Sequence, residues 1–351
     1  MKIRKVKKAL TRLSKLPLNK YLFFYIKNKI AHFALKIAKS NKVAYPSTIM
    51  LELTNKCNLS CITCAREYDY GKQMDLGRMD ENHAKKIIDE LWMYLDSVGL
   101  TGMGETFLYP NIKNIVDYIK AKNKGIIVSV STNAILPDFI TQITPLIGII
   151  DTIQVSIDGL GEVYEAIRKR GKFERLQANL EALALLCKNT STSLMMNMVV
   201  TKENYHQMSD LVKFAQKTGI QYVDFTMFNL AAVTQIEKEY YAFYQSQEFL
   251  NEFASLREAQ KQNKRVVVNY HSFDTNHSFQ ACPFPWTHFY ISWDGYLVPC
   301  CAKPFPKELN FGKVFNSGVM NVLNNKQFRN WRECWYRNQT PSFCEKCHFT
   351  A

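Results

Sequence analysis

The most informative segment of the chain reads Asn55-Lys56-Cys57-Asn58-Leu59-Ser60-Cys61-Ile62-Thr63-Cys64. It follows an apolar run, residues 48–54, that predicts a β-strand. The cysteines have the spacing Cys-x3-Cys-x2-Cys, so one loop can supply three thiolates to a [4Fe–4S] cluster. The fourth iron then lacks a protein ligand and can bind a substrate or cofactor, as the open position of a catalytic metal does.

A zinc site or a set of disulfides fits this loop less well. A structural zinc site requires four ligands, whereas the loop offers Cys57, Cys61 and Cys64 with no histidine nearby. Disulfide bonds require an oxidising compartment. The N-terminal residues carry no signal-peptide pattern, so we expect a cytoplasmic protein.

Composition points to a folded protein with room for two domains. The chain has 351 residues, of which 47% are hydrophobic and 22% are charged. No apolar run reaches the roughly 18 residues of a membrane span. The ten cysteines fall mainly into two clusters, which favours metal or redox chemistry. Cys187 stands apart among alanines and leucines, and we interpret it as a core residue.

The net charge of +14 is concentrated at the N-terminus. Residues 1–45 contain thirteen Lys or Arg and no Asp or Glu, which leaves 32 basic and 31 acidic residues elsewhere. A nearly neutral body argues against nucleic acid as a partner. Within this basic arm, apolar side chains at helical spacing form one stripe. They are Phe23, Ile26, Ile30, Phe33 and Ile37.

A basic amphipathic helix of this kind has two interpretations. Through residues 1–40 it can lie on an anionic surface, which would place the protein peripherally on the inner face of the membrane. Alternatively, the helix packs on its own domain with its lysines in water. Pro17 would separate it from a shorter basic segment before it.

The cysteine loop resembles that of the radical SAM superfamily, in which it follows the first strand of a partial (β/α)6 barrel. The resemblance implies that S-adenosylmethionine (SAM) binds the open iron through its amino and carboxylate groups. It also implies that one electron cleaves SAM to a 5′-deoxyadenosyl radical, which abstracts a substrate hydrogen. A reducing flavodoxin or ferredoxin is the implied electron donor.

Other segments resemble the SAM contacts of this family. Gly102-Met103-Gly104-Glu105 resembles the Gly-Gly-Glu motif that binds the SAM amino group, although Met103 interrupts the glycine pair. Gly102, Gly104 and Glu105 are therefore the implied contacts. Arg168 is the implied partner of the SAM carboxylate, because a guanidinium binds a carboxylate bidentately. A solvated helix charge is the alternative for Arg168.

Three strand-end residues complete the implied SAM site: Ser131, Ser156 and Asn197. Asp158-Gly159, just after Ser156, is equally typical of a turn. Strands are expected over residues 48–54, 126–132, 154–159, 193–200 and 221–227. A further strand is expected to end at Leu100. Their alternation with helical segments predicts a parallel sheet with its functional groups at the carboxyl ends.

The C-terminal part carries the second cysteine cluster. Asp294-Gly295 predicts a tight turn between alternating apolar residues. The pattern Cys…Asp-Gly-x3-Pro-Cys…Cys-x2-Cys resembles the SPASM/twitch extension of radical SAM enzymes. The resemblance implies one auxiliary [4Fe–4S] cluster on Cys282, Cys300, Cys344 and Cys347, with Cys301 as an alternate for Cys300 and Cys334 as a further candidate. A zinc ribbon is the alternative for this cysteine set.

The predicted organisation is α/β, with a small C-terminal SPASM/twitch domain after the partial (β/α)6 barrel. The basic arm covers residues 1–45, the barrel 46–232, a helical connector 233–264 and the auxiliary-cluster domain 265–351. Trp286, His288 and Tyr290 either line a substrate cavity or pack in the core.

A fully ligated auxiliary cluster can accept an electron from a substrate radical. The one-cluster layout resembles that of dehydrogenases that oxidise a secondary alcohol of a sugar or cyclitol, and the basic arm suits a lipid-linked substrate. The prediction is therefore an enzyme that oxidises a sugar, a cyclitol or a lipid-linked small molecule. The alternative is a peptide-modifying maturase that forms a crosslink or epimerises a residue. Because the arm lacks the strands of the family's peptide-recognition domain, this alternative ranks second. A non-catalytic iron–sulfur module for electron transfer or binding ranks third.

Overall fold

The computed structural model describes residues 20–348 apart from 234, 263–264, 271–272 and 274–278. Pro17 and the basic segment before it lie outside the described residues. None of the described helices combines the length and apolar character needed to cross a bilayer.

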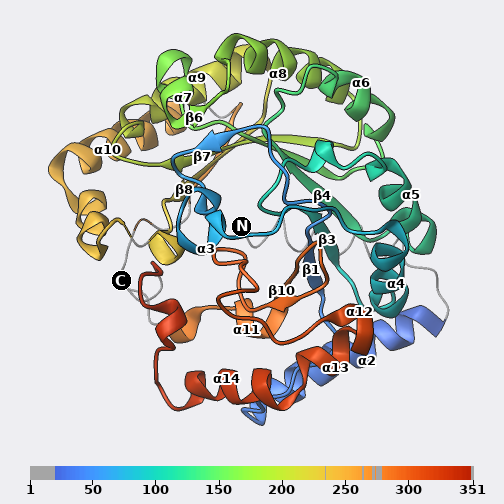
Figure 1. The fold of residues 1–351 in the computed structure, drawn as a ribbon. Coiled ribbons are helices and arrows are strands. Elements are labelled where there is room, and N and C mark those ends of the chain that lie inside the picture. The colour runs from blue at the N-terminus through green and yellow to red at the C-terminus, as the bar shows by residue number, and fades with distance from the viewer. Residues whose placement is uncertain (1–19, 234, 263–264, 271–272, 274–278, 349–351) are drawn as a thin grey trace.

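One nine-stranded sheet organises the fold, in the order β11-β10-β1-β3-β4-β5-β7-β8-β9. Its six central strands are parallel to one another. They are β1 (Thr48–Leu51), β3 (Ser97–Leu100), β4 (Ile127–Thr132), β5 (Thr152–Ser156), β7 (Ser193–Val200) and β8 (Tyr222–Met227). With helices outside them, these strands form the partial (β/α)6 barrel, so the predicted fold class is confirmed (Figure 1).

Alternation along the strands creates the barrel's two faces. In β4 and β5, Val128, Val130, Ile153 and Val155 are buried in the hydrophobic core. The residues between them point to the opposite face of the sheet, because successive side chains of a strand alternate. The polar residues of these strands therefore face the barrel interior at the strands' carboxyl ends.

An outer ring of helices covers the sheet (Figure 1). Each buries an apolar stripe, as α4 does with Ala84, Ile87, Ile88 and Leu91. The ring contains α4 (Glu81–Leu91), α5 (Ile112–Lys122), α6 (Phe139–Ile143), α7 (Gly161–Ile167), α8 (Phe173–Cys187), α9 (Met208–Thr218) and α10 (Gln247–Gln262). Cys187 ends α8 and packs, half-buried, against the core, as predicted.

The C-terminal part joins the same sheet at both edges. β9 (Val267–Tyr270) pairs with β8, and β10 (His288–Ile291) pairs in parallel with β1. β11 (Leu297–Val298) returns antiparallel to β10, which confirms the hairpin predicted at Asp294-Gly295. The boundary predicted at residue 265 therefore does not separate two sheets, because strands on both sides of it belong to one sheet.

Short helices before and after the hairpin complete the C-terminal part, and those after it contact residues 40–43. They are α11 (Phe284–Thr287), which precedes β10, then α12 (Val314–Ser317), α13 (Val319–Leu323) and α14 (Lys326–Tyr336). The Arg332 side chain of α14 is fully buried and donates to the backbone oxygens of Asn41, Pro285 and Leu323. Burial lowers the pKa of Arg332 to about 9. This side chain thus ties three separate segments together.

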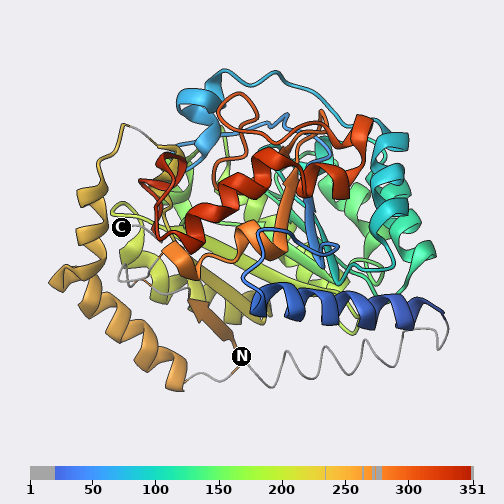
Figure 2. The ribbon, with the colours of Figure 1, turned by 90° about the horizontal axis from the view of Figure 1, so that it is seen from below.

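The N-terminal helix α2 (Lys20–Ile37) lies along the outside of the molecule (Figure 2). It is attached by the Tyr21 ring, whose centroid lies 4.5 Å from that of Trp92, and by polar groups. The Asn28 side chain exchanges two hydrogen bonds with the backbone of Tyr45, and Tyr25 and Lys29 both bind Asp96. The predicted helix is therefore present and packs on the body of the protein.

Candidate cluster and cofactor site

A cavity of ≈ 330 Å³ lies at the carboxyl ends of the central strands. It contains the three cysteines of the first cluster together with most of the implied SAM contacts. The residues expected from the sequence that line it are Cys57, Cys61, Cys64, Gly102, Gly104, Glu105, Ser131, Ser156 and Arg168. Val199, Met227 and Phe228 supply apolar walls.

The cysteine loop is held in place by a two-stranded sheet. β2 (Ser60–Cys61) pairs antiparallel with β6 (Arg168–Lys169), which sets Cys61 opposite Arg168. The Arg168 Nη1 atom lies 3.9 Å from Cys61 Sγ, and Asn133 Nδ2 lies 4.0 Å from Cys57 Sγ. Donors at such positions hydrogen-bond to thiolate ligands and tune a cluster.

Burial shapes the chemistry of these thiols. It raises the pKa of Cys57 and Cys64, and it raises the pKa of Cys61 to about 12. Iron must therefore displace a proton from each thiol on binding. No three His, Cys, Asp or Glu within the described part of the chain surround a position for a single metal ion. A [4Fe–4S] cluster places each thiolate on a different iron, so its ligands are spread more widely.

Arg168 is a buried cation beside the cluster loop. Its Nε atom lies 3.0 Å from Asp158 Oδ2, but without the alignment of a hydrogen bond. Burial alone lowers the pKa of Arg168, yet the Asp158 carboxylate and the Cys61 thiol outweigh it and raise that pKa. Asp158 is itself anchored by the Val199 amide at 2.9 Å. The guanidinium stays charged and retains donors that fit a carboxylate.

The backbone of residues 102–105 lies in close contact with that of residues 54–56, where the cysteine loop begins. A Cβ on Gly104 would lie 2.5 Å from the backbone oxygens of Thr54 and Lys56. The close approach therefore requires glycine at this position. Gly102 is equally confined, since a Cβ there would lie 2.4 Å from Glu52 Cγ.

The Glu105 carboxylate connects this loop to the end of β4. Its oxygens accept hydrogen bonds from the Phe107 amide, the Thr132 hydroxyl and the Asn133 amide at 3.1, 2.7 and 2.7 Å. Burial raises its pKa, although these donors lower it in part. A carboxylate has about four acceptor positions, so one remains for an amino group.

The strand-end residues differ in their placement. Ser131 and Ser156 face the cavity from β4 and β5. Asn197 pairs in register with Ser156, is buried in β7, and is not among the residues that line the cavity. A SAM contact at Asn197 stays a prediction.

The auxiliary cysteines form a second group. Burial raises the pKa of Cys282 to about 12, and it raises the pKa of Cys344 further with the help of neighbouring thiols. The thiols whose charges interact with that of Cys344 are Cys300, Cys347 and Cys282. The four cysteines expected to hold one cluster are therefore close together.

Cys300 and Cys301 contact each other, and the Cys301 thiol also interacts with Cys282, but only Cys301 lines the cluster cavity. Cys300 belongs to the auxiliary group, whereas Cys301 lines the cavity of Cys57, Cys61 and Cys64. Cys334 lies in α14, and no contact of its thiol with the auxiliary group is found among the described residues. The arrangement favours Cys300 over Cys301 as the auxiliary ligand, which stays a prediction.

Sequence reasoning missed Glu52. This buried carboxylate lies directly after β1. It accepts hydrogen bonds from the Tyr290 hydroxyl at 2.6 Å and from the amides of Met103 and Trp293 at 2.8 and 3.2 Å. The signal that could have found it was an acidic residue within an apolar strand run. Tyr290 thus has a buried structural contact, and Trp286, His288 and Tyr290 do not line the cluster cavity.

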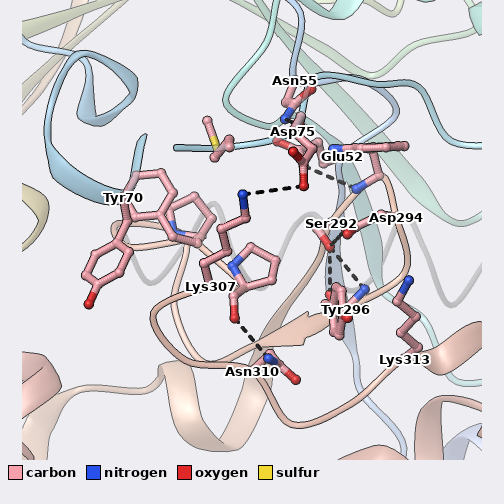
Figure 3. Close-up of a pocket in the computed structure, with 15 residues that line it drawn as sticks. Glu52, Asn55, Tyr70, Asp75, Ser292, Asp294, Tyr296, Lys307, Asn310 and Lys313 are labelled. Carbon is pink, nitrogen blue, oxygen red and sulfur yellow. Dashed lines mark hydrogen bonds and ion pairs between the residues drawn. The ribbon is translucent and has the colours of Figure 1, made fainter. Parts of the chain in front are cut away.

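Glu52 helps to line a second cavity of ≈ 480 Å³ (Figure 3). Residues of the barrel and of the C-terminal part both line it, and Lys307 reaches toward Asp75, with Nζ and Oδ2 3.5 Å apart. The labelled residues from the barrel are Glu52, Asn55, Tyr70 and Asp75. Those from the C-terminal part are Ser292, Asp294, Tyr296, Lys307, Asn310 and Lys313.

Comparison with known families agrees with this geometry. Residues 51–215 match the radical SAM superfamily, and residues 282–348 match SPASM, an iron–sulfur cluster-binding domain. The chain is a radical SAM protein with a C-terminal SPASM domain. Its radical SAM domain binds SAM and a [4Fe–4S] cluster, and its SPASM domain binds auxiliary iron–sulfur clusters. The donor set described above fits both groups.

Relatives of this radical SAM protein include two curated biosynthetic proteins. It is 31% identical to the mycofactocin maturase MftC of Mycobacterium tuberculosis, over 50% of this chain and 43% of that protein. The match thus spans less than half the length of MftC. It is 22% identical to the subtilosin biosynthesis protein AlbA of Bacillus subtilis, over 91% of this chain and 68% of that protein.

Among solved structures, the fold is similar to that of Streptococcus suis SuiB bound to the precursor peptide SuiA. The TM-score is 0.69 at 19% identity, and the match covers 92% of this chain and 74% of SuiB. This likeness concerns the fold.

Proposed function

We propose that this protein reductively cleaves SAM and uses the chemistry to modify a peptide. The observation that carries the proposal is one cavity shared by Cys57, Cys61 and Cys64 with Arg168 and the loop of residues 102–105. When bound, the cluster and SAM supply a 5′-deoxyadenosyl radical that abstracts a substrate hydrogen.

The residues of the chain bind and orient these groups. Arg168, held by Asp158 and by the β2–β6 pairing, would bind the SAM carboxylate. Glu105 would accept from the SAM amino group at its remaining acceptor position. Met227 and Phe228 would exclude water from the reacting centre.

A peptide substrate is favoured over the sugar, cyclitol or lipid-linked molecule expected from the sequence. MftC is named a maturase, AlbA acts in bacteriocin biosynthesis, and SuiB was crystallised with a precursor peptide. The sequence expectation rested on the lack of a strand pattern in the N-terminal arm. Substrate choice depends instead on cavity shape, which motif spacing does not reveal.

Glu52 lines the second cavity and hydrogen-bonds to Met103, which lines the cluster cavity, and this proximity supports an extended substrate. A peptide could place one residue near the cluster site and its flanking residues among Tyr70, Tyr296 and Lys307. Lining of this kind, with aromatic walls and a few charges, is typical of binding sites.

Cys282, Cys300, Cys344 and Cys347 would hold an auxiliary cluster, which would supply one-electron chemistry beside the SAM site. Cys301, adjacent to Cys300, lines the SAM cavity, so the two sites adjoin. A reducing flavodoxin or ferredoxin would supply the electron for SAM cleavage.

The test is anaerobic reconstitution with iron and sulfide, addition of SAM, reduction by dithionite and chromatography for 5′-deoxyadenosine. We expect this product from the wild type and from the control Cys187→Ala, and none from Cys57→Ala, Cys61→Ala or Cys64→Ala. A fully iron-loaded wild type that forms no 5′-deoxyadenosine would contradict the proposal and favour an electron-transfer module.

The substrate class is tested separately. Peptides encoded beside the gene should stimulate 5′-deoxyadenosine formation and change in mass, whereas free sugars and cyclitols should do neither. Stimulation by a sugar or cyclitol alone would overturn the peptide assignment while leaving SAM cleavage intact.

A further inference from the structure

The N-terminal helix α2 packs on the protein through a mixed face, on which the Tyr21 ring contacts Trp92 and both Leu22 and Leu35 are half-buried. Asn28 is buried against Tyr45, and Tyr25 and Lys29 contact Asp96. His32 also lies 2.8 Å from the Tyr45 backbone oxygen. Surface helices of globular proteins ordinarily turn their apolar stripe toward the core. In α2, by contrast, the stripe found in the sequence lies away from the packed face.

The apolar stripe of α2 consequently faces outward. Its five large side chains are between 47% and 67% exposed, and they run the length of the helix. They are Phe23, Ile26, Ile30, Phe33 and Ile37. A continuous exposed apolar strip of this kind marks an interaction site.

Lysines border the stripe. Lys27 follows Phe23 by four residues and precedes Ile30 by three, so it adjoins both on the helix surface. Lys36 follows Phe33 by three residues, and both lysines are exposed. Residues 1–45 contain no acidic residue to neutralise them. An apolar face edged by cations matches a helix that lies in the headgroup region of an anionic bilayer.

We propose that α2 docks the protein on an anionic lipid membrane. The helix axis lies in the membrane plane, the stripe enters the acyl boundary, and Lys27 and Lys36 contact lipid phosphates. The opposite face of α2, which contacts Tyr45 and Asp96, holds the body of the protein against the membrane surface. This inference is independent of the proposed peptide modification.

Two other occupants of the stripe are less suitable. A second copy of the chain would bring two basic arms together across a symmetric contact, each with thirteen Lys or Arg and no Asp or Glu. A nucleic acid would satisfy the lysines, but its phosphate contacts would leave the exposed Phe23, Ile30 and Phe33 unused. An anionic lipid surface satisfies both the charges and the apolar side chains.

The test measures co-flotation of the full-length, cluster-loaded protein with vesicles. The vesicles contain either phosphatidylcholine alone or phosphatidylcholine mixed with phosphatidylglycerol. We expect binding to the anionic vesicles that is at least about ten-fold stronger than to the zwitterionic ones. Ile30→Ser/Phe33→Ser should weaken this binding at least about ten-fold, because exposed apolar groups are lost without disturbing the core.

Matched controls separate the stripe from general surface properties. Leu185→Ser removes an exposed apolar side chain of α8 and should leave binding unchanged. Lys27→Glu/Lys36→Glu should abolish binding. Lys124→Glu/Lys217→Glu makes the same change in net charge at exposed positions elsewhere and should retain it.

Three results would overturn the proposal. One is wild-type protein that does not float with anionic vesicles. The second is unchanged flotation of Ile30→Ser/Phe33→Ser. The third is a wild-type dimer, or a complex with duplex DNA or RNA, that this variant disrupts while vesicle binding persists, since the stripe would then serve that partner.

Discussion

Arg168 carries a buried positive charge between the Asp158 carboxylate and the Cys61 thiol. Three separate parts of the chain fix its position: the pairing with β2, the turn after β5, and Val199, which anchors Asp158. Removing the side chain would leave Asp158 buried without its cation, which destabilises the fold. A charge-conserving change is therefore the informative one.

We predict that Arg168→Lys weakens SAM binding by about 10- to 100-fold, because a point charge replaces a planar fork that forms charge-assisted hydrogen bonds. Anaerobic equilibrium dialysis with labelled SAM measures the affinity. Lys169→Ala, at the exposed neighbour in β6, should leave it unchanged. Equal SAM affinity in Arg168→Lys and wild type would remove Arg168 from the SAM site.

The adjacent residues Cys300 and Cys301 give a second prediction. Cys300→Ser should lower the iron content of reconstituted protein by about half, since one of two clusters loses a ligand. Cys301→Ser should keep the full content, as should the control Cys187→Ser. Iron and sulfide assays measure the result. Loss of iron in Cys301→Ser but not in Cys300→Ser would reverse the assignment.

At the scale of elements, Glu52 joins β1 to the C-terminal hairpin and to the loop of residues 102–105. Its partners are the Tyr290 hydroxyl and the Trp293 and Met103 amides. Burial raises the pKa of Glu52, although these donors lower it in part. The three elements that frame the cluster cavity and the second cavity thus meet at one carboxyl group.

This raised pKa has a pH consequence. The folded chain holds the Glu52 proton to higher pH than the unfolded chain does, so this group destabilises the fold as pH rises from about 4.3 through its folded pKa. The free energy of unfolding of Glu52→Gln should therefore fall less than that of the wild type over this pH range. The difference is about 1.4 kcal/mol for each pKa unit of the shift.

Anaerobic denaturant titrations of the cluster-loaded protein at a series of pH values measure this difference. Glu239→Gln, at an exposed position, is the control and should follow the wild-type curve. Parallel curves for Glu52→Gln and wild type would mean that Glu52 is ionised equally in both states.

At the scale of the whole molecule, the radical SAM and SPASM parts share one core. Phe289 and Ile291 of β10 belong to the same buried cluster as Ile49 and Leu51 of β1. Asn324 also exchanges two hydrogen bonds with the Val43 backbone. Two parts that share a sheet and a core are expected to unfold together.

We predict coincident unfolding of both parts. Trp92→Phe leaves tryptophans only at 286, 293, 331 and 335, so its fluorescence reports the SPASM part, whereas far-ultraviolet circular dichroism reports the whole chain. The two midpoints in denaturant should agree. A fluorescence midpoint well below that of circular dichroism would indicate that the SPASM part unfolds independently.

The sequence by itself determined the cysteine loop, the six central strands and the hairpin at Asp294-Gly295. These depend on spacing and periodicity within short segments, and local geometry is enough to specify them. The auxiliary set Cys282, Cys300, Cys344 and Cys347 was likewise reached through its resemblance to a known pattern.

Only the tertiary structure decided how β10 extends the sheet beside β1, why Glu52 is buried, and how Asp158 holds Arg168. It also decided that α2 turns its apolar stripe outward. Each of these depends on contacts between residues far apart in the chain, such as Glu52 with Tyr290 and Asn28 with Tyr45. Hydrophobic periodicity identifies the apolar face of a helix, but the neighbours that pack against the helix decide where that face points.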